Sequence, residues 1–337
     1  MLATIMQATF RRFGGAFEQL STTTEPSPSC TGTLEQAVEH VVDQTSARLR
    51  AVPGYSRRLR DPVVTALRAI DEIVDQIPGV LACDRATFSS DAEVNAFFAN
   101  YTRVQEVFSH SKEVRELFDS NAGADHCFAL LCMHREERRQ LGIDMDGEVL
   151  RKDVLQTTVS FADHELISPG LDETDARCAL KCCAFNALIG HIRLTAAEAH
   201  TRADDLEGRG QAWRARLKRE SPGSPEHAAL QREVQRIETE RETGGPLLET
   251  LEDHFRHVAD ALSHPERIIS NQRISIFVDR LGIKHDGADH GEARELQLSE
   301  VQIAGEPPRV ATLVSFPRAE LLPVRDFLRE ASIFLAA

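Results

Sequence analysis

The sequence of 337 residues contains no run of 18 or more apolar residues, so it offers no candidate membrane-spanning helix. Basic residues are also in the minority, because 39 Lys and Arg stand against 53 Asp and Glu, and the formal net charge is −14. Sequence-independent binding along a nucleic-acid backbone requires clustered cations. We therefore expect no nucleic-acid partner.

The common catalytic and phosphate-binding motifs are absent as well. The sequence has no GxxxxGK[ST], GxGxxG, GxSxG or HExxH, which excludes the motif-bearing versions of NTPases, dinucleotide enzymes, α/β-hydrolases and zincins. His164 lies between two acidic residues but has no nucleophile or orienting partner nearby in the sequence, so we interpret it as part of an outward strand face. The sequence predicts no catalytic and no cofactor-binding residue, and it leaves the cofactor unknown.

Cysteine is present seven times, an odd number, and never in a CxxC spacing. No disulfide framework is expected in a chain long enough to build a core. The first residues do not form a secretory signal, since Arg11 and Arg12 follow the apolar residues instead of preceding them. The expected compartment is the cytoplasm, with peripheral attachment to the inner membrane face as an open alternative.

Residues 1–20 have apolar side chains at spacings of three and four, which predicts an amphipathic helix. Its apolar face includes Phe10, Phe13 and Phe17, and a Ser/Thr/Pro-rich linker follows at residues 21–32. Such a helix packs on its own domain, docks on a partner or lies in a membrane surface. The pattern leaves all three open.

Residues 33–138 read as a helical domain. Thr33 and Gln36 have the spacing of a capping box, which predicts a helix start at this point. Further apolar stripes predict several helices, the last of them from about residue 124 to residue 138.

Strand patterns occur on both sides of a long helical region. Residues 140–145 and 148–154 flank Asp146-Gly147, a strong hairpin dipeptide, and a strand pattern continues to about residue 167. After residue 264 the sequence predicts three further strands and a helix from about residue 320. We expect one small antiparallel sheet with a C-terminal helix, formed by residues 139–170 and 264–337.

Residues 171–263 interrupt this sheet. Helical periodicity runs for over 40 residues to about Leu217, breaks at the Pro/Gly-rich residues 221–225, and resumes to about Leu262. The second arm has apolar residues alternately four and three apart, including Leu230 and Ile237. The seam of the first arm runs through Leu180, Cys183, Ala187, Gly190, Leu194 and Ala197, then through Leu206, Gly210, Trp213 and Leu217. The pattern predicts an antiparallel coiled-coil hairpin. The fold class is therefore α+β and predominantly α-helical.

Two side-chain sets in the hairpin are candidate sites. The spacings i, i+4 and i, i+3 allow two ligands to share one metal, and the two arms would face each other. The candidate metal ligands are Cys178, Cys182, His254 and His257. Burial of these cysteines as small apolar residues is the competing interpretation.

The second set lies at the tip of the hairpin. A basic cluster beside the chain's single Trp, on an acidic protein, indicates a contact point for an acidic partner. The candidate partner-binding residues are Trp213, Arg214, Arg216, Lys218 and Arg219.

These features favour an interaction, scaffold or regulatory protein without evident catalytic activity, which acts through the hairpin on a protein partner or by self-association into a homo-oligomer. The first alternative is an enzyme or sensor that binds a metal or small ligand with the Cys and His clusters. The second is a peripheral membrane protein that uses residues 1–20.

Overall fold

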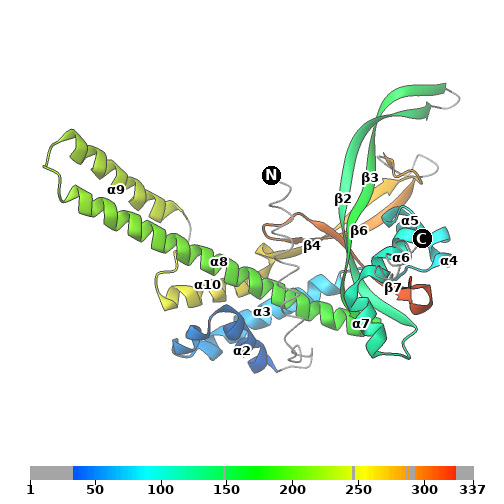
Figure 1. The fold of residues 1–337 in the computed structure, drawn as a ribbon, viewed down its shortest axis with the longest axis horizontal. Coiled ribbons are helices and arrows are strands. Elements are labelled where there is room, and N and C mark those ends of the chain that lie inside the picture. Colours follow the sequence, from blue (N-terminus) through cyan, green and yellow to red (C-terminus); the bar gives the residue numbers. More distant parts are fainter. Residues whose placement is uncertain (1–32, 147–148, 245–246, 286, 288–292, 324–337) are drawn as a thin grey trace, which may run out of the picture.

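The computed structural model describes residues 33–146, 149–244, 247–285, 287 and 293–323. As predicted, the fold combines helices and a sheet, with more helix than strand. A pair of helices and a two-stranded ribbon leave the body in different directions (Figure 1). The predicted helix at residues 1–20 with Phe10, Phe13 and Phe17, the linker at residues 21–32 and most of the predicted C-terminal helix lie outside the described residues.

The chain begins its described part with helices. The capping box is confirmed, because the Thr33 hydroxyl accepts a hydrogen bond from the Gln36 N–H and the Gln36 side chain accepts one from the Thr33 N–H. The N-terminal helices are α2 (Leu34–Thr45), the 3₁₀ helix η1 (Ala47–Ala51), α3 (Tyr55–Asp75), α4 (Arg85–Ser90), α5 (Ala92–Phe97), α6 (Tyr101–His110) and α7 (Lys112–Ser120).

The predicted helix from residue 124 to residue 138 is wrong. This segment is the first part of strand β2 (His126–Asp146). Leu131 and Met133 face one hydrophobic core and Leu130 and Cys132 face another. A strand buried on both faces reads as a continuous apolar run, which periodicity does not distinguish from a buried helix.

One sheet unites both flanks of the inserted helices, as predicted. Its order is β3-β2-β7-β6-β4-β5, and every pair along this path is antiparallel, whereas the short β1 pairs in parallel with β7. The remaining strands are β1 (Leu81–Ala82), β3 (Val149–Gly170), β4 (Ile269–Val278), β5 (Lys284–His285), β6 (Arg294–Ile303) and β7 (Arg309–Pro317). The 3₁₀ helix η2 (Pro265–Arg267) precedes β4, and η3 (Arg318–Glu320) follows β7.

Strand β7 separates two hydrophobic cores. Ala311 and Leu313 pack with α2, α3, α8 and α10 on one face, while Val314 and Phe316 pack with α4 to α7 on the other. The Phe316 ring stacks on the Phe108 ring of α6, with centroids 4.3 Å apart. Helices thus cover both faces of the sheet at its centre.

Beyond Met133, where pairing with β7 ends, β2 and β3 continue as a two-stranded ribbon. Register shifts occur opposite Asp153, Asp163 and Ser168, and each of these residues has a positive φ, between 52° and 61°. Extra residues of this kind are β-bulges, which bend and twist a strand. They account for the curved path of the ribbon in Figure 1.

The inserted region contains α8 (Glu173–Leu217), α9 (Pro225–Thr243) and α10 (Leu251–Ser263). The predicted break at residues 221–225 is confirmed, and the helical stretch after it consists of α9 and α10. Helices α8 and α9 lie side by side and run in opposite directions (Figure 1). Knobs-into-holes packing of a coiled coil remains a prediction.

The seam predicted for the first half of α8 is wrong in its register. Leu180 of the predicted seam is buried, but so are Phe185, Leu188, Ile189 and Ile192, which lie outside that seam, whereas Leu194 of the seam is 43% exposed. This half of α8 contacts α2, α3, α10 and the sheet. A helix surrounded by several elements buries a wider stripe than a two-helix seam requires.

Polar contacts fix the base of α8 on α3. The Arg177 guanidinium donates hydrogen bonds to the carbonyls of Val74 and Ile77, at 2.9 and 3.3 Å, and so satisfies the end of α3. The Lys181 ammonium lies 2.9 Å from the Asp71 carboxylate. The direction in which α8 leaves the body is therefore set by α3.

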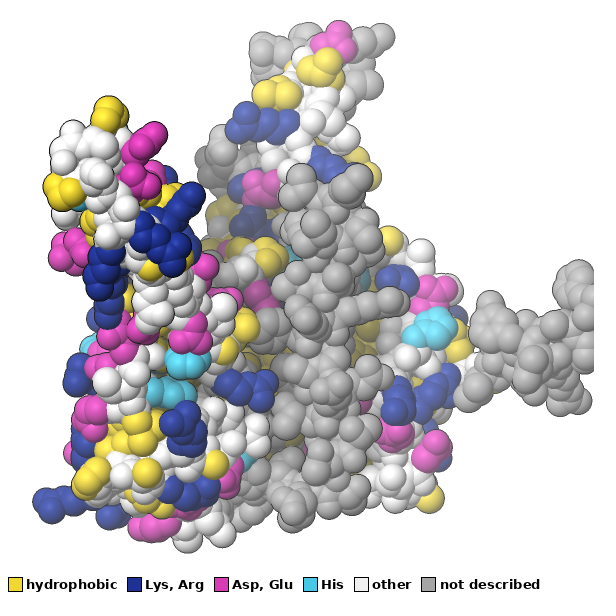
Figure 2. Space-filling view, turned by 60° about the vertical axis from the view of Figure 1, so that its left-hand side comes forward, with side chains coloured by type: hydrophobic (Ala, Val, Ile, Leu, Met, Phe, Trp, Pro, Cys, Tyr) yellow, Lys and Arg dark blue, Asp and Glu magenta, His cyan; other side chains and the backbone are white. Residues whose placement is uncertain are grey.

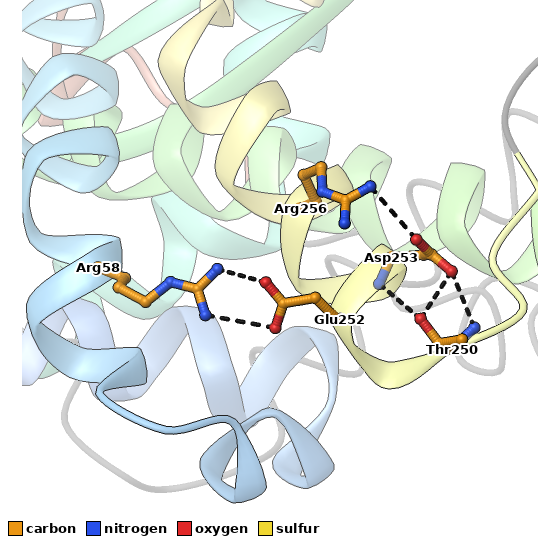
Figure 3. A network of polar contacts seen from close by, with 5 residues as sticks. All are labelled: Arg58, Thr250, Glu252, Asp253 and Arg256. Atoms are coloured by element: carbon orange, nitrogen blue, oxygen red, sulfur yellow. Dashed lines mark hydrogen bonds and ion pairs between the residues drawn. The ribbon is translucent and has the colours of Figure 1, made fainter.

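Figure 3 shows how the returning chain is attached where α10 begins. Thr250 and Asp253 form a capping box, and the Asp253 carboxylate also receives a hydrogen bond from Arg256. The Arg58 guanidinium of α3 pairs with both carboxylate oxygens of Glu252 and covers the Phe255 ring at 4.2 Å. A cap, an ion pair and a cation–π contact thus anchor α10.

We predict that Thr250→Ala lowers the free energy of unfolding by about 1 kcal/mol, because the orphan N–H of Asp253 loses its acceptor. Urea denaturation measures this change. The matched control is Thr201→Ala, since the Thr201 hydroxyl only bonds to the Ala197 carbonyl within α8. The control is expected within about 0.5 kcal/mol of the wild type, and equal losses in both variants would contradict the role of the cap.

Candidate functional site

We use the name helical arm for residues 200–217 of α8 together with α9. The residues of α8 that belong to the main core end at Ile192, and the 25 residues from there to Leu217 span roughly 37 Å. Along the arm, α8 buries Ala203, Leu206 and Gly210, and α9 buries only Ile237. The arm has little apolar core of its own.

Ion pairs along the flank supplement this small core. Arg209 lies 3.2 Å from both Asp205 of α8 and Glu240 of α9, and Arg214 lies 3.3 Å from Glu238. These pairs are exposed, so solvent screens them and each contributes little to stability. They hold the two helices in register more than they stabilise them.

All five predicted partner-binding residues gather at the end of the helical arm. The Arg216 guanidinium covers the Trp213 ring at 5.0 Å, while Lys218 follows the last helical residue. Within the described residues, only Arg214 of the four cations forms an ion pair. Figure 2 shows Lys and Arg side chains beside acidic ones on the arm at the upper left.

A hollow of about 400 Å³ lies at this tip. It is lined by Arg216, Arg219 and Glu220 from the end of the first helix and by Glu226, Ala229 and Leu230 from α9. Two guanidinium groups, two carboxylates and two apolar side chains therefore line it. Such a hollow is suited to a segment that combines charge with one apolar side chain.

The α9 side of the hollow was missed in the sequence. Leu230 was expected in the seam, but it is only partly buried and lines the hollow. Because the helices are antiparallel, residues at equal distances from the 221–225 turn face each other, as Gly210 faces Ile237. Counting residues outward from the turn in both directions would have placed Glu226 and Leu230 opposite Arg216 and Arg219.

The structure does not bring the predicted metal ligands together. The His257 Nε2 atom lies 3.1 Å from the Thr195 hydroxyl, and Cys182 is 13 residues, or roughly 20 Å, farther down α8. Cys178 is disulfide-bonded. Within the described residues, no group of three or more His, Cys, Asp or Glu side chains is arranged to hold a metal ion.

The pairing failed because α10 does not continue α9 in line, so His254 and His257 contact α8 nearer its middle than its base. Buried thiols elsewhere are no better suited to nucleophilic chemistry. Burial raises the pKa of both Cys127 and Cys132 to about 12, and a thiol in that range is protonated at neutral pH.

His164 was interpreted as part of an outward strand face, and this is wrong. Its ring stacks on Phe98 at 4.7 Å, and its Nε2 atom lies 2.7 Å from the Phe97 carbonyl. It borders an open hollow of about 650 Å³ with Arg103 and Glu106 of α6. Burial lowers the pKa of His164, which keeps the ring neutral and fits a role in packing.

Four histidines lie where the helical arm leaves the body, on α8 and α10. Burial is the main cause that lowers the pKa of His191, His254 and His257. Repulsion from His257, His200 and Arg48 lowers the pKa of His254 further. The folded protein therefore favours the neutral forms of His191, His254 and His257.

This arrangement predicts a loss of stability in mild acid. In the folded state the pKa values lie below the ordinary 6.5, so protons bind preferentially to the unfolded chain, and stability falls as the pH drops from about 7.5 to about 5.5. Urea denaturation at the two pH values measures this fall. The double variant His254→Gln/His257→Gln should show a smaller fall, and an unchanged fall would contradict the assignment to these rings.

Comparisons with protein-family models, with curated proteins and with solved structures find no match to this chain. Among the described residues, no helix is both long and apolar enough to cross a membrane.

Proposed function

We propose that this chain is an interaction protein of the scaffold or regulatory kind, which binds a protein partner through the tip of its helical arm. The observation that carries the proposal is the position of Trp213 and the neighbouring cations at the end of a helix whose other half is fixed in the core. A cluster of Trp and Arg is the composition of many binding hot spots.

The sparse core of the arm supports a binding role. The arm projects far from the body and contributes little to the stability of the fold. Its length is therefore not explained by a role in folding. A helix continuous with the core does hold its tip at a defined distance and direction from the body, which lowers the entropic cost of binding. The arm therefore suits recognition at a distance.

The alternatives rest on less. The hypothesis of a metal-dependent enzyme or sensor has less support, because the Cys and His side chains expected to form its site are not brought together. Membrane attachment through residues 1–20 remains a prediction for a segment outside the described residues. Self-association remains a further outcome, since a second copy of this chain also qualifies as the partner. Cytoplasmic location is likewise a prediction.

Site-specific photo-crosslinking in the native cells tests the proposal. A crosslinking residue replaces Lys218 at the tip in one protein and Lys112 in a control, both in the full-length chain; Lys112 is exposed on α7, in the body. We expect one adduct of defined mass at position 218 that is absent at position 112. Identical adduct patterns at both positions would contradict an interaction through the arm.

A further inference from the structure

The hollow at the tip has cations beside it that have no acidic partner among the described residues. Arg216 and Arg219 line it and Lys218 lies between them in the sequence, and none of the three forms an ion pair with the described residues. The cations also lie at the C-terminus of a 45-residue helix, where they offset the negative end of the helix dipole. That stabilising role needs no hollow and no tryptophan.

The hollow also has apolar lining. Ala229 and the half-buried Leu230 of α9 line it, and on the other helix the Arg216 guanidinium covers the Trp213 ring. Water over these apolar side chains is released when an apolar side chain of a ligand enters. A ligand that offers both a negative charge and an apolar side chain therefore fits better than one that offers charge alone.

We infer that the tip hollow binds an acidic peptide segment with one aliphatic side chain, which lies over Ala229 and Leu230 while its carboxylates pair with Arg216, Lys218 and Arg219. This inference rests on the proposed function and names the class of partner. The segment pairs with the unpaired cations, and charge complementarity sets its orientation.

Glu220 and Glu226 allow a test that a purely basic patch would not offer, because neutralising them should change the affinity in a predictable direction. Both line the hollow, so their carboxylates repel an acidic ligand. Neutralising them with Glu220→Gln/Glu226→Gln should tighten binding of an acidic peptide, and the same change would weaken binding of a cationic one. Glu226 lies in the first turn of α9, where a carboxylate interacts favourably, but only modestly when exposed, with the positive end of the helix dipole.

The test is a titration of the full-length protein with labelled synthetic peptides, followed by fluorescence anisotropy and by the emission of Trp213, the single tryptophan of the chain. The first peptide contains Glu residues around one Leu, and the second has Ser in place of Leu. A single-stranded oligonucleotide and anionic phosphatidylserine vesicles are the remaining probes.

We expect the Leu peptide to bind several-fold more tightly than the Ser peptide, to shift the Trp213 emission, and to weaken strongly between 50 and 500 mM salt. The variant Lys218→Glu/Arg219→Glu should lose at least tenfold in affinity. The charge-matched control Lys112→Glu/Arg267→Glu, in the body, should bind as the wild type does, because both positions are exposed and far along the chain from the tip.

Equal affinity for the two peptides, preferential binding of the oligonucleotide or the vesicles, or unchanged affinity of the Glu220→Gln/Glu226→Gln variant would overturn the inference. A tip-specific crosslink at position 218 combined with no peptide binding would overturn the class of partner and leave the arm as an interaction element. Peptide binding without a crosslink in cells would instead contradict the proposed function.

Discussion

The fold depends on strand β7, which is buried on both faces and pairs with strands from both sides of the inserted helices. Through β2 it binds residues 126–133, and through β6 it binds the C-terminal strands, so segments more than 170 residues apart become neighbours. Its side chains then divide the two cores between the sheet faces. Without this strand neither helical layer has a surface to cover, and α8 has no fixed base. The direction in which the helical arm projects is thus a consequence of strand pairing in the body.

Two segments project from the body around β7, the helical arm and the ribbon of β2 and β3, and they are held in place by different contacts. The helical arm inherits its direction from α8, whose base is held by Arg177 and Lys181, and its return from α10, which is held by Arg58. The ribbon of β2 and β3 is bent by bulges and touches the turn before β5 through the Val159 N–H and the Gly282 carbonyl. It exposes the cross-strand pair Leu141 and Leu155, at 68% and 64%. Within the described residues, the tip of the arm has a hollow lined by both charged and apolar side chains.

Much of this architecture follows from the sequence, because its strongest signals are local. The turn at residues 221–225, the Thr33 capping box and the strands after residue 264 depend on neighbouring residues alone. The predictions are wrong where burial by distant parts of the chain determines the secondary structure or the buried face of a helix. The first part of β2, up to Met133, is apolar on both faces and has no strand alternation. The first half of α8 packs against several elements, so its buried stripe does not follow the two-helix seam. The tip residues from Trp213 to Arg219 are consecutive and were found together, whereas Leu230 and Glu226 required the antiparallel pairing. The distance between Cys182 and His257 required knowing that α10 does not extend α9.

The central claim is that stability resides in the body around β7 and that the helical arm is built for contact. Hydrogen exchange of the full-length protein, followed by mass spectrometry of peptides, tests it most directly. Amides of β7 should exchange only through global unfolding, and amides of residues 206–240 should exchange at least about a hundredfold faster through local opening. Protection of the arm equal to that of β7 would show that the arm belongs to the folding core, and would contradict the account.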